Sequence, residues 1–258
     1  MIPSEEEPAE LGHILLRIGT SLLHAGASTT RVVKNITRIA DAFGYEAHVD
    51  LGTRVVSISL DNKDREEHVF TGSRSAPSMP GADFKVITGI SRLSWSVVEK
   101  RMTLTELKND YERAVEANPY PRIIVLGLVG LSGASFCYIF GGRSIEMAIT
   151  FVATIAGLLV RQELQRLKYN PYLVTFSSAA CATLVVSLMS MLHLTIRLDH
   201  AFATSILFLI PGVPLIIAFI DLMNGYIING LDRGVHASIH AFAIATGLAT
   251  MLYLFNIS

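Results

Sequence analysis

The sequence predicts a membrane protein in which an N-terminal cytoplasmic α+β domain, residues 1–121, precedes an all-α bundle of five transmembrane helices, residues 122–258. The first observation behind this prediction is charge. Residues 1–121 hold 14 Lys/Arg and 17 Asp/Glu, whereas residues 122–258 hold only 7 and 5. The second is that the later part consists largely of long apolar stretches, as a membrane-spanning bundle requires.

Two amphipathic helices begin the soluble domain. In LGHILLRIGTSLLHAG, apolar residues recur at helical spacing, and in STTRVVKNITRIADAFG a second such stripe follows. Gly26 and Gly44 are expected to end the two helices, because glycine accepts the left-handed conformation found after a helix. Ser28 or Thr29 can cap the start of the second helix.

A small sheet and two more helices complete the domain. AHVDLGTRVVSISLD reads as strand, turn and strand, and EEHVFTG adds a third short strand. After the loop SRSAPSMPGAD, the helices FKVITGISRLSWSVVEKR and LTELKNDYERAVEA follow, the second with Thr103 or Thr105 as its cap. NPYPR then ends the domain before the first apolar stretch.

Five stretches satisfy the length that a spanning helix needs, about 20 mostly apolar residues. They are residues 123–142, 144–160, 172–192, about 201–222, and 238–255. Small residues within them, such as Gly130, Gly133 and Ser178, permit helices to approach closely where apolar burial gives no drive.

The distribution of Lys and Arg beside the spans predicts the orientation. Basic residues gather before the first span and in the loop RQELQRLKYNP, whereas the opposite side carries only Arg143 and Arg197. The N-terminal domain is therefore expected in the cytoplasm and the C-terminus outside, with the chain crossing the inner (cytoplasmic) membrane several times.

The fourth span contains the stretch LFLIPGVPLIIAFIDLMNG, in which Pro211, Gly212 and Pro214 interrupt the helix. Proline cannot donate a backbone hydrogen bond, so the carbonyls of Leu207 and Ile210 lose their helical donors. Such breaks at the bilayer midplane are where many transporters bind ions and substrates. A simple packing kink is the alternative.

Polar residues follow the break. Asp221, Asn224, Gly225, Asn229 and Asp232 recur at a spacing that places them on one stripe of a continuing helix, which Arg233 would end. Intramembrane carboxylates tend to serve ion or proton coupling. We therefore expect a polar pathway wall with Asp221 near its cytoplasmic mouth, the alternative being a solvated helix end.

Other chemistry is not indicated. There is no basic surplus for nucleic acid, no phosphate-binding loop, and no ligand cluster for a metal or other cofactor around Cys137 and Cys181. His24, Ser28, Asp41 and His48 could be drawn into a hydrolytic triad, but no motif places them together. Towards the outer side, Glu146 and Arg143 are expected to pair, and His193, Asp199 and His200 to lie at the interface.

The pattern FLIPGVPLIIAFIDLMNGYIINGLDR resembles the signature of the threonine/serine exporter (ThrE-type) family. The matching positions are Pro211, Gly212, Pro214, Asp221, Leu222, Gly225, Gly230 and Arg233. The opening LLRIGTSLLHAGASTTRVVKNITRIADAFGY, the FGG at 140–142 and Arg161 are also similar to that family. Arg143 stands where some relatives have an acidic residue.

This resemblance implies the larger, YjjP-like component of a split secondary exporter for small carboxylate-bearing metabolites: threonine and serine, or a dicarboxylate such as succinate. It implies a separate small membrane subunit carrying the second exporter domain, a homo-oligomer, or both. A membrane-anchored hydrolase and a receptor or scaffold are the alternatives. The candidate transport residues are Pro211, Gly212, Pro214, Asp221, Asn224, Gly225, Asn229, Gly230 and Arg233.

Overall fold

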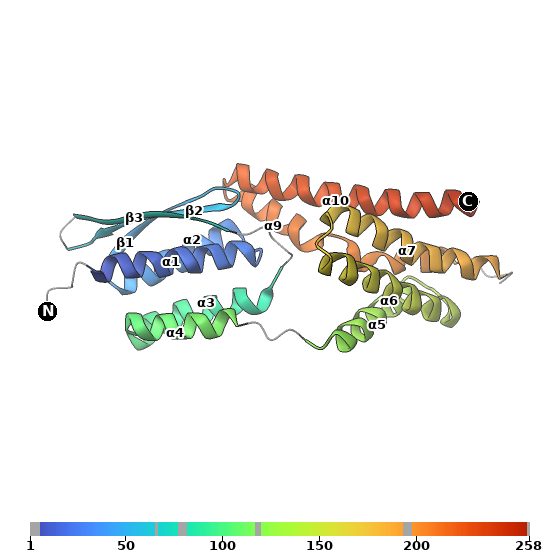
Figure 1. Cartoon of the computed structure of the whole chain (residues 1–258), viewed down its shortest axis with the longest axis horizontal. Helices are drawn as coiled ribbons and strands as arrows, with labels where there is room; N and C mark the ends of the chain where they lie inside the picture. The colour runs from blue at the N-terminus through green and yellow to red at the C-terminus, as the bar shows by residue number, and fades with distance from the viewer. Residues whose placement is uncertain (1–5, 65–66, 77–81, 117–119, 193–197, 257–258) are drawn as a thin grey trace. The chain divides into compact units, whose positions relative to one another are not determined.

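The computed structural model describes residues 6–64, 67–76, 82–116, 120–192 and 198–256 (Figure 1). Its contacts divide the chain into two compact units. Unit 1 contains Met1–Asn118 together with Val213–Gly234, and unit 2 contains Pro119–Gly212 together with Val235–Ser258. A segment from the apolar half of the sequence therefore packs with the charged N-terminal half.

Unit 1 is an α+β unit, as the sequence predicts. Its elements are α1 (Glu6–His24), α2 (Thr29–Ala42), β1 (Tyr45–Leu51), β2 (Val55–Asn62), β3 (Glu67–Ser75), α3 (Phe84–Lys100), α4 (Leu104–Val115), nearly all of α9 (Gly212–Met223) and the start of α10 (Ile227–Leu254). The strands form one antiparallel sheet in the order β1-β2-β3, with Ile58 paired to Val49 on one side and to Gly72 on the other. The three predicted strands and the four predicted helices are confirmed.

The core of unit 1 lies between α1 and the sheet and continues to α2, α3 and α4. Alternate residues of β2, namely Val56, Ile58 and Leu60, are fully buried and meet the predicted stripe of α1. Gly19 brings α1 close to the sheet, because a Cβ there would lie 2.9 Å from the Val56 side chain.

Unit 2 is helical. It contains α5 (Arg122–Ile139), α6 (Ser144–Arg166), α7 (Pro171–Met191), α8 (Asp199–Ser205), the 3₁₀ turn η1 (Leu207–Leu209) and the later part of α10. Small residues set its closest contacts: a Cβ on Gly133 would lie 2.5 Å from the Thr154 hydroxyl, and one on Gly157 would lie 2.9 Å from the Ser178 carbonyl oxygen. These contacts agree with the predicted role of small residues.

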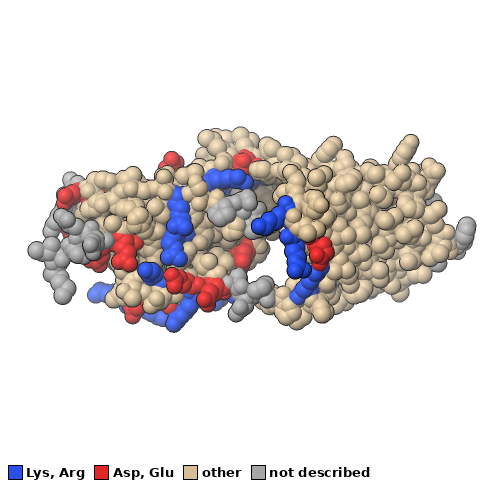
Figure 2. All heavy atoms as spheres, viewed as in Figure 1, with Lys and Arg blue, Asp and Glu red and all other residues tan. Residues whose placement is uncertain are grey.

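Four helices of the described chain are long and apolar enough to cross a membrane: α5, α6, α7 and α10. A fifth span results if the broken pair Asp199–Leu209 and Gly212–Met223 is counted as one. Figure 2 shows little charge over the visible face of the part of the molecule that contains α5, α6 and α7. Large apolar side chains of the candidate spans, such as Leu128 of α5, Leu173 of α7 and Phe242 of α10, are exposed. These exposed side chains fit a lipid-facing surface.

Some predicted boundaries were wrong or lie outside the described residues. The last helix begins at Ile227 and not near 238, and β3 extends into the predicted loop as far as Ser75. Positions 77–81 of that loop, residues 118–119 of NPYPR, His193 and Arg197 lie outside the described residues.

Of the two threonines proposed to cap α4, Thr103 does so. Its hydroxyl accepts from the Glu106 backbone N–H at 3.4 Å, and its own backbone N–H donates to Glu106 Oε2 at 2.8 Å. The Thr103 hydroxyl also donates to Glu106 Oε2 at 2.8 Å. The bonds from the Thr103 backbone N–H and hydroxyl to this carboxylate lower the pKa of Glu106. Because the folded-state pKa lies below the unfolded one, this stabilisation is present above the unfolded pKa and is lost as pH falls through the folded pKa.

We therefore expect Thr103→Ala to lower the free energy of unfolding by about 1 kcal/mol at neutral pH. The protein also loses stability at acidic pH as Glu106 becomes protonated, and Thr103→Ala should make this loss smaller. Thr105→Ala is the matched control, because Thr105 is exposed and lies two residues further on. It should change neither the free energy of unfolding nor its dependence on pH. Denaturant unfolding of the full chain in detergent, at neutral and acidic pH, measures both effects. Equal effects of the two substitutions would contradict the assignment of the cap.

Candidate functional site

The predicted helix break is present between η1 and α9. The backbone at Ile210 is extended (φ −61°, ψ 124°), and α9 starts at Gly212, so Pro214 falls in its first turn, where a missing N–H is tolerated. The two carbonyls expected to lack donors are satisfied locally. The Ile210 N–H donates to the Leu207 carbonyl at 3.1 Å, and the Gly212 N–H donates to the Ile210 carbonyl at 2.8 Å.

The predicted polar stripe on one continuing helix was wrong. Helix α9 ends at Met223, and α10 starts at Ile227. Between them the Tyr226 N–H donates to the Asp221 carbonyl at 2.9 Å, and Gly225 takes φ +84°. The positive φ of Gly225 ends α9, so residues after it do not continue the helical spacing of residues before it. Arg233 also lies within α10 and does not end it.

After this turn α10 packs directly on α9. Gly230 makes the close approach possible, because a Cβ there would lie 2.9 Å from the Ala218 carbonyl oxygen and 2.7 Å from the Leu222 side chain. Residues of α9 and α10 can therefore bind the same partner, although they do not lie on one stripe of a single helix.

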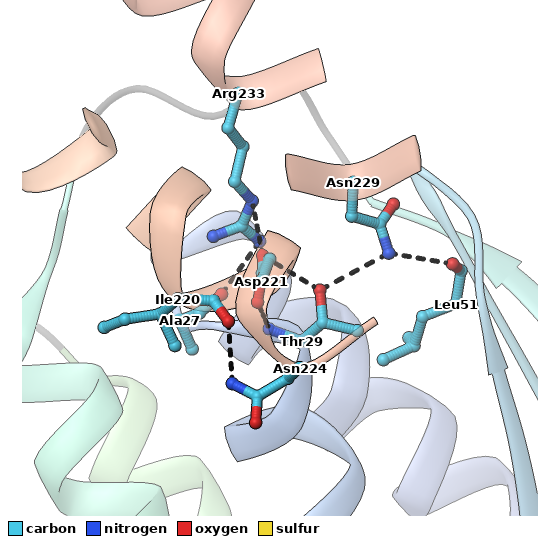
Figure 3. Close-up of polar contacts among 8 residues, drawn as sticks. All are labelled: Ala27, Thr29, Leu51, Ile220, Asp221, Asn224, Asn229 and Arg233. Carbon is cyan, nitrogen blue, oxygen red and sulfur yellow. Dashed lines mark hydrogen bonds and ion pairs between the residues drawn. The ribbon is translucent and has the colours of Figure 1, made fainter. Parts of the chain in front are cut away.

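Asp221 is fully buried and binds the N-terminus of α2 (Figure 3). Its Oδ1 accepts from the Thr29 backbone N–H at 2.9 Å, and its Oδ2 accepts from the Thr29 hydroxyl at 3.1 Å. Ser28, which the sequence offered as a cap, makes no such side-chain bond. The carboxylate thus caps α2 from a distant part of the chain, where the helix dipole favours negative charge.

Arg233 and Asn229 of α10 bind the same region. Arg233 Nε lies 3.5 Å from Asp221 Oδ2, and its Nη2 donates to the Ala27 carbonyl at 2.8 Å. Asn229 Nδ2 donates to the Leu51 carbonyl at 3.0 Å and to the Thr29 hydroxyl at 3.3 Å. We call Thr29, Asp221, Asn229 and Arg233 the buried polar network, and all four are at most 6% exposed.

The other candidates lie outside this network. Asn224 is exposed and donates to the Ile220 carbonyl at 2.7 Å (Figure 3). A Cβ on Gly212 would meet no atom of the described residues within 4 Å, and Pro211 and Pro214 flank it at the break. Of the nine candidates, Asp221, Asn229 and Arg233 are connected to one another. Asp221 and Asn229 both bond Thr29, and Arg233 pairs directly with Asp221.

Two of the residues considered for a hydrolytic triad, Asp41 and His48, have separate partners. Asp41 pairs with Lys63 at 2.9 Å, and His48 lies 3.1 Å from Asp61 on the exposed face of the sheet. Ser28 precedes α2. No group of three or more His, Cys, Asp or Glu in the described parts of the chain is placed to hold a metal ion, and both cysteines are free.

A second polar set lies in unit 2 and was missed as a set from the sequence. Glu146 Oε1 lies 3.2 Å from His200 Nδ1, whereas from Arg143, its expected partner, it receives a backbone N–H at 2.9 Å. One and two turns further along α6, Thr150 lies 3.4 Å from the Thr204 hydroxyl and Thr154 lies 3.4 Å from the Ser205 carbonyl. The i, i+4, i+8 spacing of Glu146, Thr150 and Thr154 was the available signal.

Sequence comparisons agree along almost the whole chain. The profile of the family described as "Putative threonine/serine exporter" matches residues 13–255. The chain is 27% identical over 260 residues to a Klebsiella aerogenes protein named "Probable succinate transporter subunit YjjP", covering 100% of this chain and 98% of that protein. It is 27% identical over 255 residues to the Escherichia coli (strain K12) protein of the same name, covering 98% and 97%. No solved structure is significantly similar.

The buried ion pair predicts a strong coupling between Asp221 and Arg233. Removing one partner leaves the other charge buried and uncompensated, so Asp221→Ala should lower the free energy of unfolding by about 3–5 kcal/mol. Arg233→Met in the Asp221→Ala background should then cost much less than Arg233→Met alone. Thermal or denaturant unfolding of the four proteins in detergent measures the double-mutant cycle.

Asp110→Ala with Arg113→Met is the matched control, because that pair lies on the exposed surface of α4 at 3.2 Å. Its coupling should not exceed about 1 kcal/mol. Additive effects of the Asp221 and Arg233 substitutions would contradict the buried pair.

The packing of α10 on α9 predicts different responses at two neighbouring glycines. Gly230→Ala should push the two helices apart and lower the unfolding temperature, because its methyl group would meet the Ala218 carbonyl oxygen. Gly234→Ala, one turn later, places its methyl group at an ordinary 3.9 Å from Ala218 and should be tolerated. Comparable unfolding temperatures for both variants would show that α10 does not approach α9 closely at Gly230.

Proposed function

The chain belongs to the threonine/serine exporter family, and from this membership we propose that it is the larger component of a secondary-active exporter of small carboxylate-bearing metabolites. The substrates of this proposal are threonine and serine, or a dicarboxylate such as succinate. The observation that carries it is the family match over residues 13–255. Candidate spans of unit 2 and the broken helix beside them support transport over an enzymatic role.

The proposed substrate path uses the break. Pro211, Gly212 and Pro214 expose a short extended backbone segment between η1 and α9. Half-helix ends of this kind offer dipoles and backbone groups to a substrate at the bilayer midplane. The open space around the Gly212 Cα supports this role, since a close approach by a ligand needs room there.

The proposed gate is the buried polar network. Asp221 is ten residues beyond Pro211 on the α9 side of the break and is held by Thr29 and Arg233. Protonation of Asp221 would cancel its attraction to Arg233 and weaken the cap on α2, so that a proton could release α9 and α10 from the α1–α2 turn. Asn229, Gly225 and Gly230 shape the same helix pair, and Asn224 lies on its exposed side.

The proposal includes a second subunit. Both curated relatives are named as transporter subunits, which supports a separate small membrane protein that carries the second exporter domain. A homo-oligomer is compatible with it. We place the chain in the inner membrane with lipid around unit 2, the N-terminal domain (residues 1–121) in the cytoplasm and the C-terminus outside, on the distribution of Lys and Arg.

Counterflow tests the function. Vesicles containing the chain, with and without the co-encoded small membrane protein, are preloaded with unlabelled threonine, serine or succinate and then given the labelled compound. At least one label should accumulate above empty vesicles when both proteins are present. Binding of the compounds without flux would support the receptor alternative instead.

In the same vesicles, Asp221→Asn should slow counterflow and flatten its dependence on pH, because the coupling carboxylate is removed. Asp110→Asn, which alters an exposed carboxylate of α4, is the control and should leave both unchanged. An Asp221→Asn protein with unchanged rate and pH dependence would end the coupling role and leave Asp221 a purely structural cap.

A further inference from the structure

Arg161 is a charged residue of the helical unit, and no carboxylate in the described parts of the chain balances its charge. It lies on α6 and is half-buried, and it follows an apolar run of seventeen residues that contains one carboxylate, Glu146. Glu146 pairs with His200, and the nearby Glu163 pairs with Arg122. Within the parts of the chain that the structure describes, no carboxylate forms an ion pair with Arg161.

The one hydrogen bond of the Arg161 side chain is long. Its Nη1 donates to the Phe208 carbonyl at 3.4 Å. A guanidinium has five N–H donors in a rigid fork, so most of its capacity for hydrogen bonding is left for something else. A half-buried positive charge is costly in an apolar unit, and a bound anion would offset that cost.

Polar groups of α7 and α10 lie near this part of α6. One turn before Arg161, a Cβ on Gly157 would lie 2.9 Å from the Ser178 carbonyl oxygen, so α6 packs closely on α7 here. On α7 and α10, Thr175 Oγ1 lies 2.9 Å from His240 Nδ1, and the Tyr172 ring lies 4.9 Å from the His240 ring. The Tyr172 hydroxyl also bonds His236 Nδ1. Arg161 lies close enough to His240 to act on it electrostatically, and so does the neighbouring His236. We call these five residues the basic cluster: Arg161, Tyr172, Thr175, His236 and His240.

The basic cluster adjoins the helix break. Phe208, which accepts from Arg161, belongs to η1, two residues before the extended Ile210. One turn before Arg161, Gly157 lets α6 approach this segment closely, because a Cβ there would lie 3.1 Å from the Phe208 ring. The guanidinium is therefore held beside the end of η1 by contacts within unit 2.

We propose that the basic cluster binds the carboxylate of the transported metabolite, with Arg161 as the anchoring residue. The fork of a guanidinium matches a carboxylate with two parallel hydrogen bonds. The His240 imidazole, whose Nδ1 bonds the Thr175 hydroxyl, has a second ring nitrogen that can donate. This inference deepens the proposed function and rests on it for the choice of a small metabolite as the ligand, but the site is defined by residues of this chain alone.

Equilibrium binding tests the site without flux. Labelled succinate, threonine and serine are titrated onto the purified full-length chain in lipid nanodiscs. At least one should bind, and acetate should compete where acetamide does not, because acetamide lacks the carboxylate charge. Arg161→Gln should weaken binding at least about tenfold, and Arg161→Lys should weaken it less, because lysine keeps the charge and loses the fork.

Arg166→Gln is the matched control, since Arg166 is an exposed arginine in the last turn of the same helix, and it should bind as the unaltered chain does. If Arg161→Gln yields no folded protein, Arg161→Lys decides alone. If Arg161→Gln folds and binds as well as the unaltered chain, the inference is overturned. If it does not fold, undiminished binding by Arg161→Lys overturns it. The absence of binding of all three compounds to the unaltered chain would also overturn it.

The two proposals fail separately. Counterflow by the unaltered chain together with undiminished binding by Arg161→Gln would remove the site and leave the exporter function. Binding that depends on Arg161 without counterflow in the presence of the small membrane protein would leave the site and remove the exporter function.

Discussion

The Asp221 carboxylate is the constraint on which the arrangement of unit 1 depends. It is fully buried, and burying a carboxylate is unfavourable unless hydrogen bonds and an opposite charge compensate it. Thr29 supplies two hydrogen bonds and Arg233 the opposite charge. Each partner comes from a different element, so the start of α2, the end of α9 and the start of α10 must be held in one relative position for the carboxylate to be tolerated.

Three charged groups of the described chain differ in how far protein groups balance their charge. The Asp221–Arg233 pair is buried, and both side chains have further hydrogen bonds to protein groups. The Glu146–His200 pair joins α6 to α8, with His200 partly exposed, and its charge depends on the protonation of the imidazole. Arg161 has one long hydrogen bond to a carbonyl and no ion pair among the described residues. From the first of these groups to the last, the described protein groups balance less of the charge. This difference supports the proposed gating role for Asp221 and the proposed ligand role for Arg161.

Periodicity predicted most of the elements correctly because burial dominates the free energy of each. The apolar stripe of α1 and the alternation of β2 meet in one core, and Thr103 caps α4 through a contact that spans only three residues. The polar stripe from Asp221 to Asp232 was wrong because one local event, the positive φ of Gly225, ends α9 and resets the helical register. Glycine at that position was visible in the sequence, but glycine is also common within membrane helices, so the pattern could not distinguish the two.

The sequence by itself determined that a charged α+β part is followed by an apolar helical part, because hydropathy is a local property of the chain. It also determined the helix break at Pro211, because the proline ring restricts only its own part of the backbone. It also carried the family resemblance. Only the tertiary structure decided which polar residues have partners. Asp221 meets Thr29 across 192 residues of chain, and Asn229 meets Leu51 across 178. Arg161 has no carboxylate partner among the residues that the structure describes. Such pairings depend on which helix faces pack together, and that is set by the sum of many weak contacts and not by the spacing of any one motif.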